Sequence, residues 1–354
     1  MKRMLQIFFA GTIIFQGELK GQAKADSLLE TYYKKSEAVG IVAGYLTPSQ
    51  NWSSSIGLKD KESNELLSTS STIRLASIAK IMTAVAVMQL VEAKKIELES
   101  PINRYCPKVS DNHKHITVRQ LLNHSGGIRG YKSNKERNNK VEYASLEDAY
   151  EIFKNDPLLF EPGSSFSYTT YGYTLLGLII EKVSGVTYES YLKRNIWEPL
   201  NMNNTGVEKY DDIPESSSSL YHKSVKGKLK TPNYRTNLSD RLPGGGVYSS
   251  VNDILLFGKG ILDGSLINSD SFDQMSENSG LKNEGNAYGL GLFLYGENPK
   301  YGNVVGHGGA QIGSSTQLML LPDKNAVVFV GSNTSGISGD IFYLNFSLFG
   351  EACE

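Results

Sequence analysis

One apolar stretch, residues 71–91 (STIRLASIAKIMTAVAVMQLV), constrains the fold of this chain more than any other. From Ala76 to Leu90 it has no Pro or Gly and is apolar on nearly every face of a helix, which is typical of a helix buried in a large domain. Lys80 lies inside this run. Because an unpaired buried Lys is costly, its presence there indicates a function.

The chemistry of this stretch is predicted by two residues three positions apart, Ser77 and Lys80. On a helix, that spacing places both side chains on the same face, one turn from each other. A Ser in the first turn also gains from free backbone N–H groups and the positive end of the helix dipole. Burial lowers the pKa of a Lys, and a neutral amine can accept the serine proton. The pair therefore predicts a nucleophile beside its base.

The same Ser-x-x-Lys spacing occurs twice more, at Ser190 with Lys193 and at Ser279 with Lys282. Those two pairs lie in polar or Gly/Asn-rich sequence, whereas only Lys80 is surrounded by apolar residues. The apolar run is nearly long enough to span a bilayer, but its internal polar residues argue against a transmembrane helix.

The bulk composition is that of a soluble globular protein. The chain has 354 residues, of which 40% are apolar and 21% charged, with a net charge of −1. This length suffices for one large or two modest domains, and the absence of a basic excess gives no indication of nucleic-acid binding.

Residues 1–25 have the form of a secretory signal peptide. Lys2 and Arg3 precede the apolar MLQIFFAGTIIF, and residues 21–23 (GQA) offer small residues for cleavage. We therefore expect a secreted or periplasmic protein that contacts a membrane only if the signal remains uncleaved. N-terminal sequencing of the protein from its host tests this expectation.

The Cys and His residues predict neither a disulfide framework nor a metal site. Cys106 and Cys353 are far apart in sequence, so we expect free thiols, with a single bridge as the alternative. His113 and His115 could bind a metal, but no third ligand is nearby and a solvated loop is the simpler interpretation. No metal or cofactor is expected.

Strand patterns occur at both ends of the chain. A helix over residues 26–36 leads to an apolar run, residues 39–46 (VGIVAGYL), and to its expected partner strand WSSSIGL. From Tyr288 onward, short β-rich runs alternate with Gly, Asn and Pro-Asp turns, as in an antiparallel sheet. We therefore expect the N-terminal hairpin to join the C-terminal sheet.

The middle of the chain is mostly helical and includes a helix from about Tyr171 to a stop at Gly185. The expected fold is α+β, with residues 26–354 forming a sheet lobe (26–70 and 285–354) and a helical lobe (71–284). The cleft between the lobes is the natural place for a site.

Two further residues are candidates for that site. Tyr168 lies in an aromatic loop before a helix and could shuttle a proton, although a chain with 20 Tyr residues could also use it for packing. His307 follows a strand and is flanked by glycines that allow a substrate to approach the backbone; a structural His is the alternative. We interpret His124, in the short amphipathic helix expected within residues 116–130, as structural.

Five segments together resemble the serine β-lactamase and penicillin-binding-protein superfamily, on the branch of class C β-lactamases, D-Ala-D-Ala peptidases and related esterases. In chain order they are RLASIAK, RQLLNHSGGI, EPGSSFSYTTYGYTLLGLIIEKVSG, LPGGGVYSSVNDILLFG and VVGHGGAQIG. The resemblance spans about residues 40–333 and implies the β-lactamase/transpeptidase-like fold, with an antiparallel sheet flanked by helices and a second, mostly helical lobe.

The resemblance also implies roles for particular residues. Ser77 attacks a carbonyl, Lys80 and Tyr168 move the proton, and the backbone N–H groups of Ser77 and Ala310 hold the oxyanion. The residues expected to bind substrate are Thr170, His307, Gly308 and Gly309. Two of these depart from the family pattern, since Thr170 replaces the Asn of Tyr-x-Asn and His307 replaces the Lys of Lys-Thr-Gly.

The sequence thus predicts a serine hydrolase that forms an acyl-enzyme on an amide or ester of a small molecule or peptide, most simply a peptidase or esterase. One alternative is a true β-lactamase or D-Ala-D-Ala carboxypeptidase, against which the two departures count. Another is a non-catalytic binding or self-assembling protein on the same fold. No Gly-x-Ser-x-Gly motif of an α/β-hydrolase is present.

Overall fold

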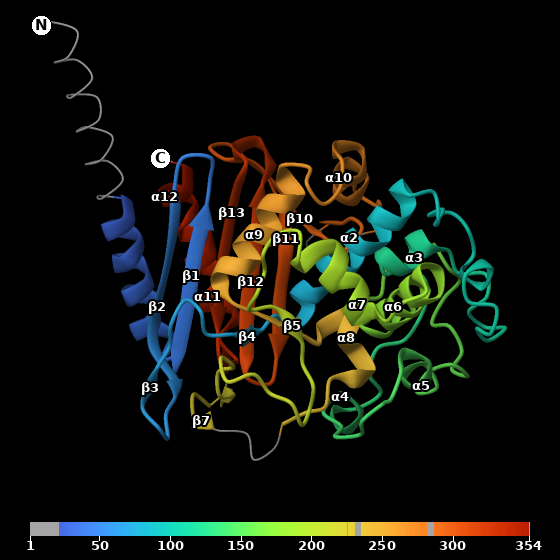
Figure 1. Ribbon diagram of the computed structural model, residues 1–354, viewed down its shortest axis with the longest axis horizontal. Coiled ribbons are helices and arrows are strands. Elements are labelled where there is room, and N and C mark those ends of the chain that lie inside the picture. The colour runs from blue at the N-terminus through green and yellow to red at the C-terminus, as the bar shows by residue number, and fades with distance from the viewer. Residues whose placement is uncertain (1–20, 225, 231–234, 282–286, 354) are drawn as a thin grey trace, which may run out of the picture.

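The computed structural model describes residues 21–353 except 225, 231–234 and 282–286 (Figure 1). Its largest element is an eight-stranded sheet in which every pair of neighbouring strands is antiparallel. In sheet order the strands are β3 (Glu65–Leu66), β2 (Asn51–Asp60), β1 (Gly40–Leu46), β13 (Ala326–Ser332), β12 (Ser314–Leu321), β11 (Gly302–Gln311), β10 (Phe293–Asn298) and β9 (Ala287–Tyr288).

The hairpin of β1 and β2 joins the C-terminal strands through β1, which pairs with β13 over Ile41–Leu46. The predicted union of the two chain ends in one sheet is therefore confirmed. Two small sheets lie outside it, made by β14 (Thr334–Ser335), β6 (Tyr221–Lys223) and β7 (Leu229–Lys230), and by β4 (Ile73–Arg74), β8 (Val247–Ser249) and β5 (Gly206–Val207).

Alternate residues of the strands face two different cores, because successive side chains of a strand point to opposite faces of a sheet. On one face, Ile41, Ala43 and Tyr45 pack with a helix over residues 21–36, with α11 (Ser338–Ser347) and with α12 (Phe349–Cys353). On the other face, Val42 packs with the main core that includes the helical part of the chain.

That helical part surrounds α2 (Ala79–Glu92), whose residues are almost all buried, as its apolar sequence predicts. The longest helix beside α2 is α6 (Tyr171–Ser184), which ends at the left-handed Gly185, where the stop was expected. The remaining α-helices are α3 (Val118–Leu122), α4 (Asn134–Arg137), α5 (Leu146–Tyr150), α7 (Tyr188–Leu192), α8 (Leu242–Gly245), α9 (Val251–Leu262) and α10 (Ser269–Ser276). Short 3-10 or π turns cover Ala76–Ile78, Ile102–Arg104, Lys193–Trp197, Ser239–Arg241 and Pro322–Lys324.

The architecture is therefore α+β, as predicted, with an antiparallel sheet between helices and a mostly helical part beside it (Figure 1). Helix α9 lies within the residues expected for the helical lobe, yet it packs on β13 and β1 of the sheet. The exact bounds of the two lobes stay a prediction. Residues 1–20 of the expected signal peptide lie outside the described residues.

Among the described helices, none combines the length and apolar character needed to cross a bilayer. Cys106 lies in the main core and Cys353 in the last helix against the second core; no disulfide joins them, as expected.

The packing of α9 on the sheet depends on Gly258. A Cβ atom at this position would lie 2.5 Å from Val327 Cγ1 and 3.0 Å from Leu320 Cδ2. We expect Gly258→Ala to destabilise the protein by about 1–3 kcal/mol, because overpacking outweighs the better helix propensity of Ala. Gly339→Ala in α11 is the control, since a Cβ there meets nothing within 4 Å. Denaturant unfolding should separate the two variants, and equal midpoints would contradict this account.

Candidate active site

Ser77 lies in a 3-10 turn, Ala76–Ile78, immediately before α2, and not in the first turn of the α-helix as the sequence suggested. The preceding residue, Ala76, has φ +51°, a left-handed conformation that costs a non-Gly residue on the order of 1–3 kcal/mol. Hydrogen bonds hold the chain just before this turn in place: Leu75 N–H donates to Val247 O at 2.9 Å and Thr316 Oγ1 donates to Leu75 O at 2.9 Å. The strained turn therefore presents Ser77 from a rigid support.

Lys80 is the first-turn residue of α2 that faces Ser77, and its side chain is fully buried. Its Nζ lies 3.3 Å from Ser77 Oγ and 2.7 Å from the carbonyl oxygen of Gly244. Burial, with a smaller effect of the Arg241 charge, lowers the pKa of Lys80 to about 7. A substantial fraction of this amine is neutral at neutral pH and can accept a proton from Ser77.

The Gly-Gly turn of the sequence is the short helix α8, which packs against α2. Thr83 Oγ1 donates to Pro243 O at 2.6 Å, one turn beyond the Lys80 contact with Gly244 O. A Cβ at Gly244 would lie 2.5 Å from Thr170 Cγ2, so only Gly fits there. Sequence reasoning identified this turn as a family motif but did not foresee that its carbonyl holds Lys80.

The Tyr168 hydroxyl contacts the Ser77 side chain and lies 3.5 Å from His307 Nε2. Its ring covers the Lys80 amine, with Nζ 4.9 Å from the ring centroid. Burial raises the pKa of Tyr168, which disfavours a phenolate. Tyr168 is thus brought to the predicted place, and its neutral hydroxyl suits a proton relay better than a base.

His307 on β11 is buried, and burial together with the Lys80 charge lowers its pKa to about 3. Its Nδ1 lies 2.6 Å from Gly308 O, which requires Nδ1–H as the donor. Nε2 is then an acceptor for the phenols of Tyr288, at 3.2 Å, and Tyr168. His307 lines the cleft as predicted, but as a neutral group already engaged by protein partners.

The edge of β11 beyond His307 is open toward the cleft. Pairing between β10 and β11 ends at Phe293 with Gly306, whereas on its other side β11 pairs with β12 as far as Gln311. A Cβ at Gly309 would lie 2.3 Å from Leu75 O, so this Gly lets the strand approach the nucleophile turn closely. The two predicted oxyanion residues, Ser77 and Ala310, line the same cleft.

This cleft has a volume of about 820 Å³ and lies between β11, the nucleophile turn, the Tyr168 loop and α8. Thr170 is on its wall, where it contacts the Tyr131 phenol. Arg241, also on the wall, is buried, pairs with Asp240 at 2.8 Å and lies 4.8 Å from the Tyr131 ring centroid. Sequence reasoning missed Tyr131, Arg241 and Asp240, because no local pattern distinguishes them from surface residues.

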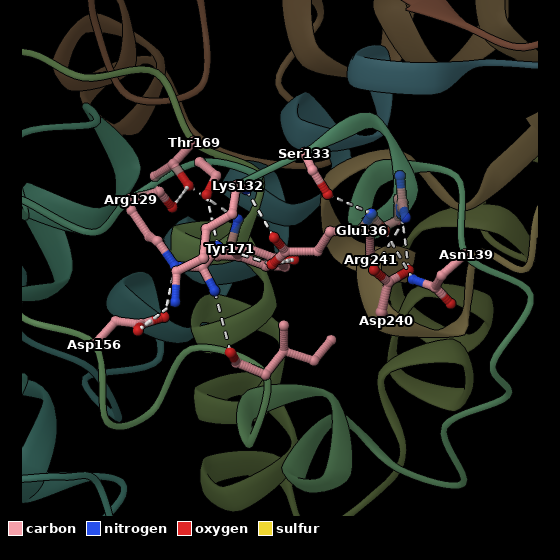
Figure 2. Close-up of polar contacts among 12 residues, drawn as sticks. Arg129, Lys132, Ser133, Glu136, Asn139, Asp156, Thr169, Tyr171, Asp240 and Arg241 are labelled. Carbon is pink, nitrogen blue, oxygen red and sulfur yellow. Dashed lines mark hydrogen bonds and ion pairs between the residues drawn. The ribbon is translucent and has the colours of Figure 1, made fainter.

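An ion-pair network fixes the segment that forms one rim of the cleft, residues 130–137, as Figure 2 shows. Arg129 Nη1 donates to Glu136 at 2.8 Å, and Arg129 Nε pairs with Asp156. Glu136 also accepts from Tyr171 OH at 2.7 Å and from the Lys132 N–H at 2.7 Å. Since Tyr171 begins α6, the rim is tied directly to the helix that follows Tyr168.

His124 supports Tyr168 from behind, which agrees with its interpretation as structural. It is buried at φ +61°, its Nδ1 accepts from Thr169 N–H at 3.3 Å, and its ring centroid lies 4.3 Å from that of Tyr168. The helix before it, α3, is shorter than predicted and ends at Leu122.

The two other His residues do not approach the cleft. His113 is buried, with Nδ1 2.9 Å from Tyr150 OH, so the prediction of a solvated loop is wrong for this residue, whereas His115 is exposed. Within the described part of the chain, no three His, Cys, Asp or Glu side chains are grouped as a metal site would need.

Lys80 should give the activity a characteristic pH dependence. Below pH 7 the amine is protonated and cannot act as a base, so kcat/KM should rise with pH through about 7 and then level off. Lys80→Ala should abolish this rise and lower kcat/KM by about 10²- to 10⁴-fold. Lys193→Ala, at the exposed Lys of another Ser-x-x-Lys, should leave the profile unchanged. A wild-type profile that is flat around pH 7 would refute Lys80 as the base.

Comparison with known proteins identifies the family of the chain. Residues 25–344 match the family model described as Beta-lactamase. The chain is 27% identical to the human mitochondrial serine beta-lactamase-like protein LACTB, over 81% of this chain and 69% of that protein. It is 28% identical to penicillin-binding protein 4* of Bacillus subtilis, over 87% and 70%.

Among solved structures, a D-stereospecific amidohydrolase from Streptomyces superposes with a TM-score of 0.77 at 26% identity, over 92% of this chain and 98% of that one. With a family model that spans nearly all of the described residues and a matching fold, the chain belongs to the Beta-lactamase family, within the serine β-lactamase and transpeptidase superfamily.

Proposed function

We propose that the protein is a serine hydrolase that acts through an acyl-enzyme on Ser77 to cleave an amide or ester bond, as a peptidase or esterase. The observation that carries this proposal is the buried Lys80 amine, 3.3 Å from the Oγ of Ser77, a residue that lines the cleft. A structural Lys needs no hydroxyl partner in a cleft, whereas a nucleophile needs a base within this distance.

In the proposed reaction, Ser77 Oγ bonds to the substrate carbonyl carbon as its proton passes to Lys80 Nζ. The carbonyl oxygen becomes an oxyanion that the backbone N–H groups of Ser77 and Ala310 stabilise. Tyr168 relays the proton from Lys80 to the leaving nitrogen or oxygen as the bond to the acyl carbon breaks. Water then attacks the acyl carbon and gives a proton to Lys80, the bond from the acyl carbon to Ser77 Oγ breaks, and Lys80 returns the proton to Ser77 Oγ as the carboxylic acid leaves.

Amide cleavage is supported by the similarity to an enzyme described as a D-stereospecific amidohydrolase, and both departures from the family pattern weigh against β-lactams. The Thr170 side chain is short and contacts Tyr131, and His307 is neutral and buried. In the family pattern, an Asn in place of Thr170 binds a substrate amide and a Lys in place of His307 binds a substrate carboxylate. Neither Thr170 nor His307 can make the corresponding contact. We therefore place a β-lactamase or D-Ala-D-Ala carboxypeptidase activity second, and a purely binding protein third.

We expect a fluorophosphonate probe or an activated ester to label Ser77 alone. Ser77→Ala should abolish labelling. Ser190→Ala should leave it unchanged, because Ser190 Oγ already accepts a hydrogen bond from Thr187 Oγ1 at 2.8 Å. Intact mass followed by peptide mapping locates the adduct. A protein that stays unlabelled by both reagents would favour the non-catalytic alternative, and an adduct on any other Ser would refute this assignment.

β-Lactams should be poor substrates compared with a small neutral ester. A missing hydrogen bond costs on the order of 1–3 kcal/mol, or about 5- to 150-fold in rate if it acts in the transition state. Thr170→Asn should therefore shift the ratio of penicillin to ester turnover toward the penicillin.

The matched control for that shift is Thr170→Val, which has nearly the same shape as Thr but offers no polar contact, and which should not shift the ratio toward penicillin. Turnover of both substrates is followed by absorbance under identical conditions. Efficient penicillin hydrolysis by the wild type would show that the two departures do not limit the substrate range.

A further inference from the structure

The cleft continues past the oxyanion residue into a second cavity of about 750 Å³. The two cavities adjoin, because the same six residues line both: Asn134, Arg137, Arg241, Ala310, Gln311 and Ser338. The extension therefore begins beside the predicted oxyanion hole, at the Gln311 end of β11.

The extension is lined by positive charge. Arg137, Lys230 and Arg241 are among its lining residues, and none of the described lining residues is an Asp or Glu. Such a concentration of one sign is local, because the chain as a whole carries a net charge of only −1.

Not all of this charge is neutralised by the protein. Arg241 is paired with Asp240. Arg137 and Lys230 are exposed, and neither forms an ion pair with any residue that the structure describes. These two cations are available to a ligand.

The N-terminus of α11 adds to the same field. Ser338, the first residue of this ten-residue helix, lines both cavities. The N-cap residue, Ile337, provides no side-chain hydrogen bond, so the positive end of the helix dipole is not neutralised by a side-chain cap. The acidic residue of the first turn, Asp340, is paired with Lys35 at 3.3 Å.

The geometry of the site decides which half of a substrate reaches this extension. The leaving group must lie near its proton donor, Tyr168, which is at the His307 end of the open strand edge. The carbonyl oxygen points to Ala310. The acyl chain then runs the opposite way along β11, toward Gln311 and the extension.

We propose that the extension binds an anionic group on the acyl half of the substrate, so that the enzyme prefers acyl groups that carry a carboxylate. This inference rests on the proposed hydrolase function and specifies its substrate class. The same charge disfavours acyl groups that carry an ammonium, such as an amino acid with a free amino group at this end.

The test uses p-nitrophenyl esters that share one leaving group and differ in the end of the acyl chain. Hexanoate and octanoate end in a methyl group, the monoesters of adipic and suberic acids replace that methyl with a carboxylate, and aminohexanoate carries an ammonium. After subtraction of spontaneous hydrolysis, kcat/KM for at least one monoester should exceed that of its neutral match by about 3- to 10-fold. The preference should weaken as NaCl is raised.

The double variant Arg137→Gln/Lys230→Gln should remove the preference, so that the ratio of kcat/KM for each monoester to that of its neutral match falls to about one or below. The matched control is Lys135→Gln, because Lys135 lies on the same helix as Arg137 and lines neither of the two cavities. The control should retain the full preference for the carboxylate.

The outcomes separate the two proposals. If no ester is hydrolysed and Ser77 is not labelled, the proposed function fails. If neutral esters are hydrolysed but neither monoester exceeds its neutral match, or the control abolishes the preference as fully as the double variant, the anionic extension is overturned and the hydrolase proposal stands.

Discussion

The rest of the site depends on a single buried amine. Lys80 is completely enclosed, and within the described part of the chain it makes hydrogen bonds to Ser77 Oγ and the Gly244 carbonyl. A permanently charged ammonium would be destabilising when buried in this way. An amine with a pKa of about 7, by contrast, gains or loses a proton near neutral pH with only a small change in free energy. The apolar surroundings of α2 therefore have two effects. The packing stabilises the helical core, and the same burial lowers the Lys80 pKa so that part of the amine is neutral near pH 7.

Close backbone approach is the second requirement, and glycines meet it at two points around the cleft. Gly309 lets β11 lie against the nucleophile turn, and Gly244 lets α8 lie against Thr170. Leu75, just before the strained Ala76, accepts a hydrogen bond from Thr316 of β12 and donates one to Val247 O of β8. These hydrogen bonds stabilise the unfavourable conformation of Ala76, and they give Ser77 a defined position relative to Ala310.

The charges of the groove are distributed differently from what the family pattern suggests. At the His307 end the expected cation is replaced by a neutral imidazole, buried among Tyr168, Tyr288 and Phe293. At the opposite end, Arg137 and Lys230 introduce positive charge beside the oxyanion residue. Under the proposed function, this arrangement places the cations on the acyl side of the scissile bond and not on the leaving-group side.

The sequence by itself determined the elements whose signal is local: the buried α2 helix with Ser77 and Lys80, the helix from Tyr171 that ends at Gly185, and the strands at both chain ends. Motif order also located Tyr168 and His307. Only the tertiary structure decided three other features. Ser77 lies in a 3-10 turn, and Lys80 donates a hydrogen bond to Gly244 O, 164 residues away in the chain. Arg137 and Lys230 line the same cavity beside β11. The physical reason is that periodicity reports burial along one element, whereas a pKa, a close backbone contact or a shared electric field depends on distances between residues far apart in the chain.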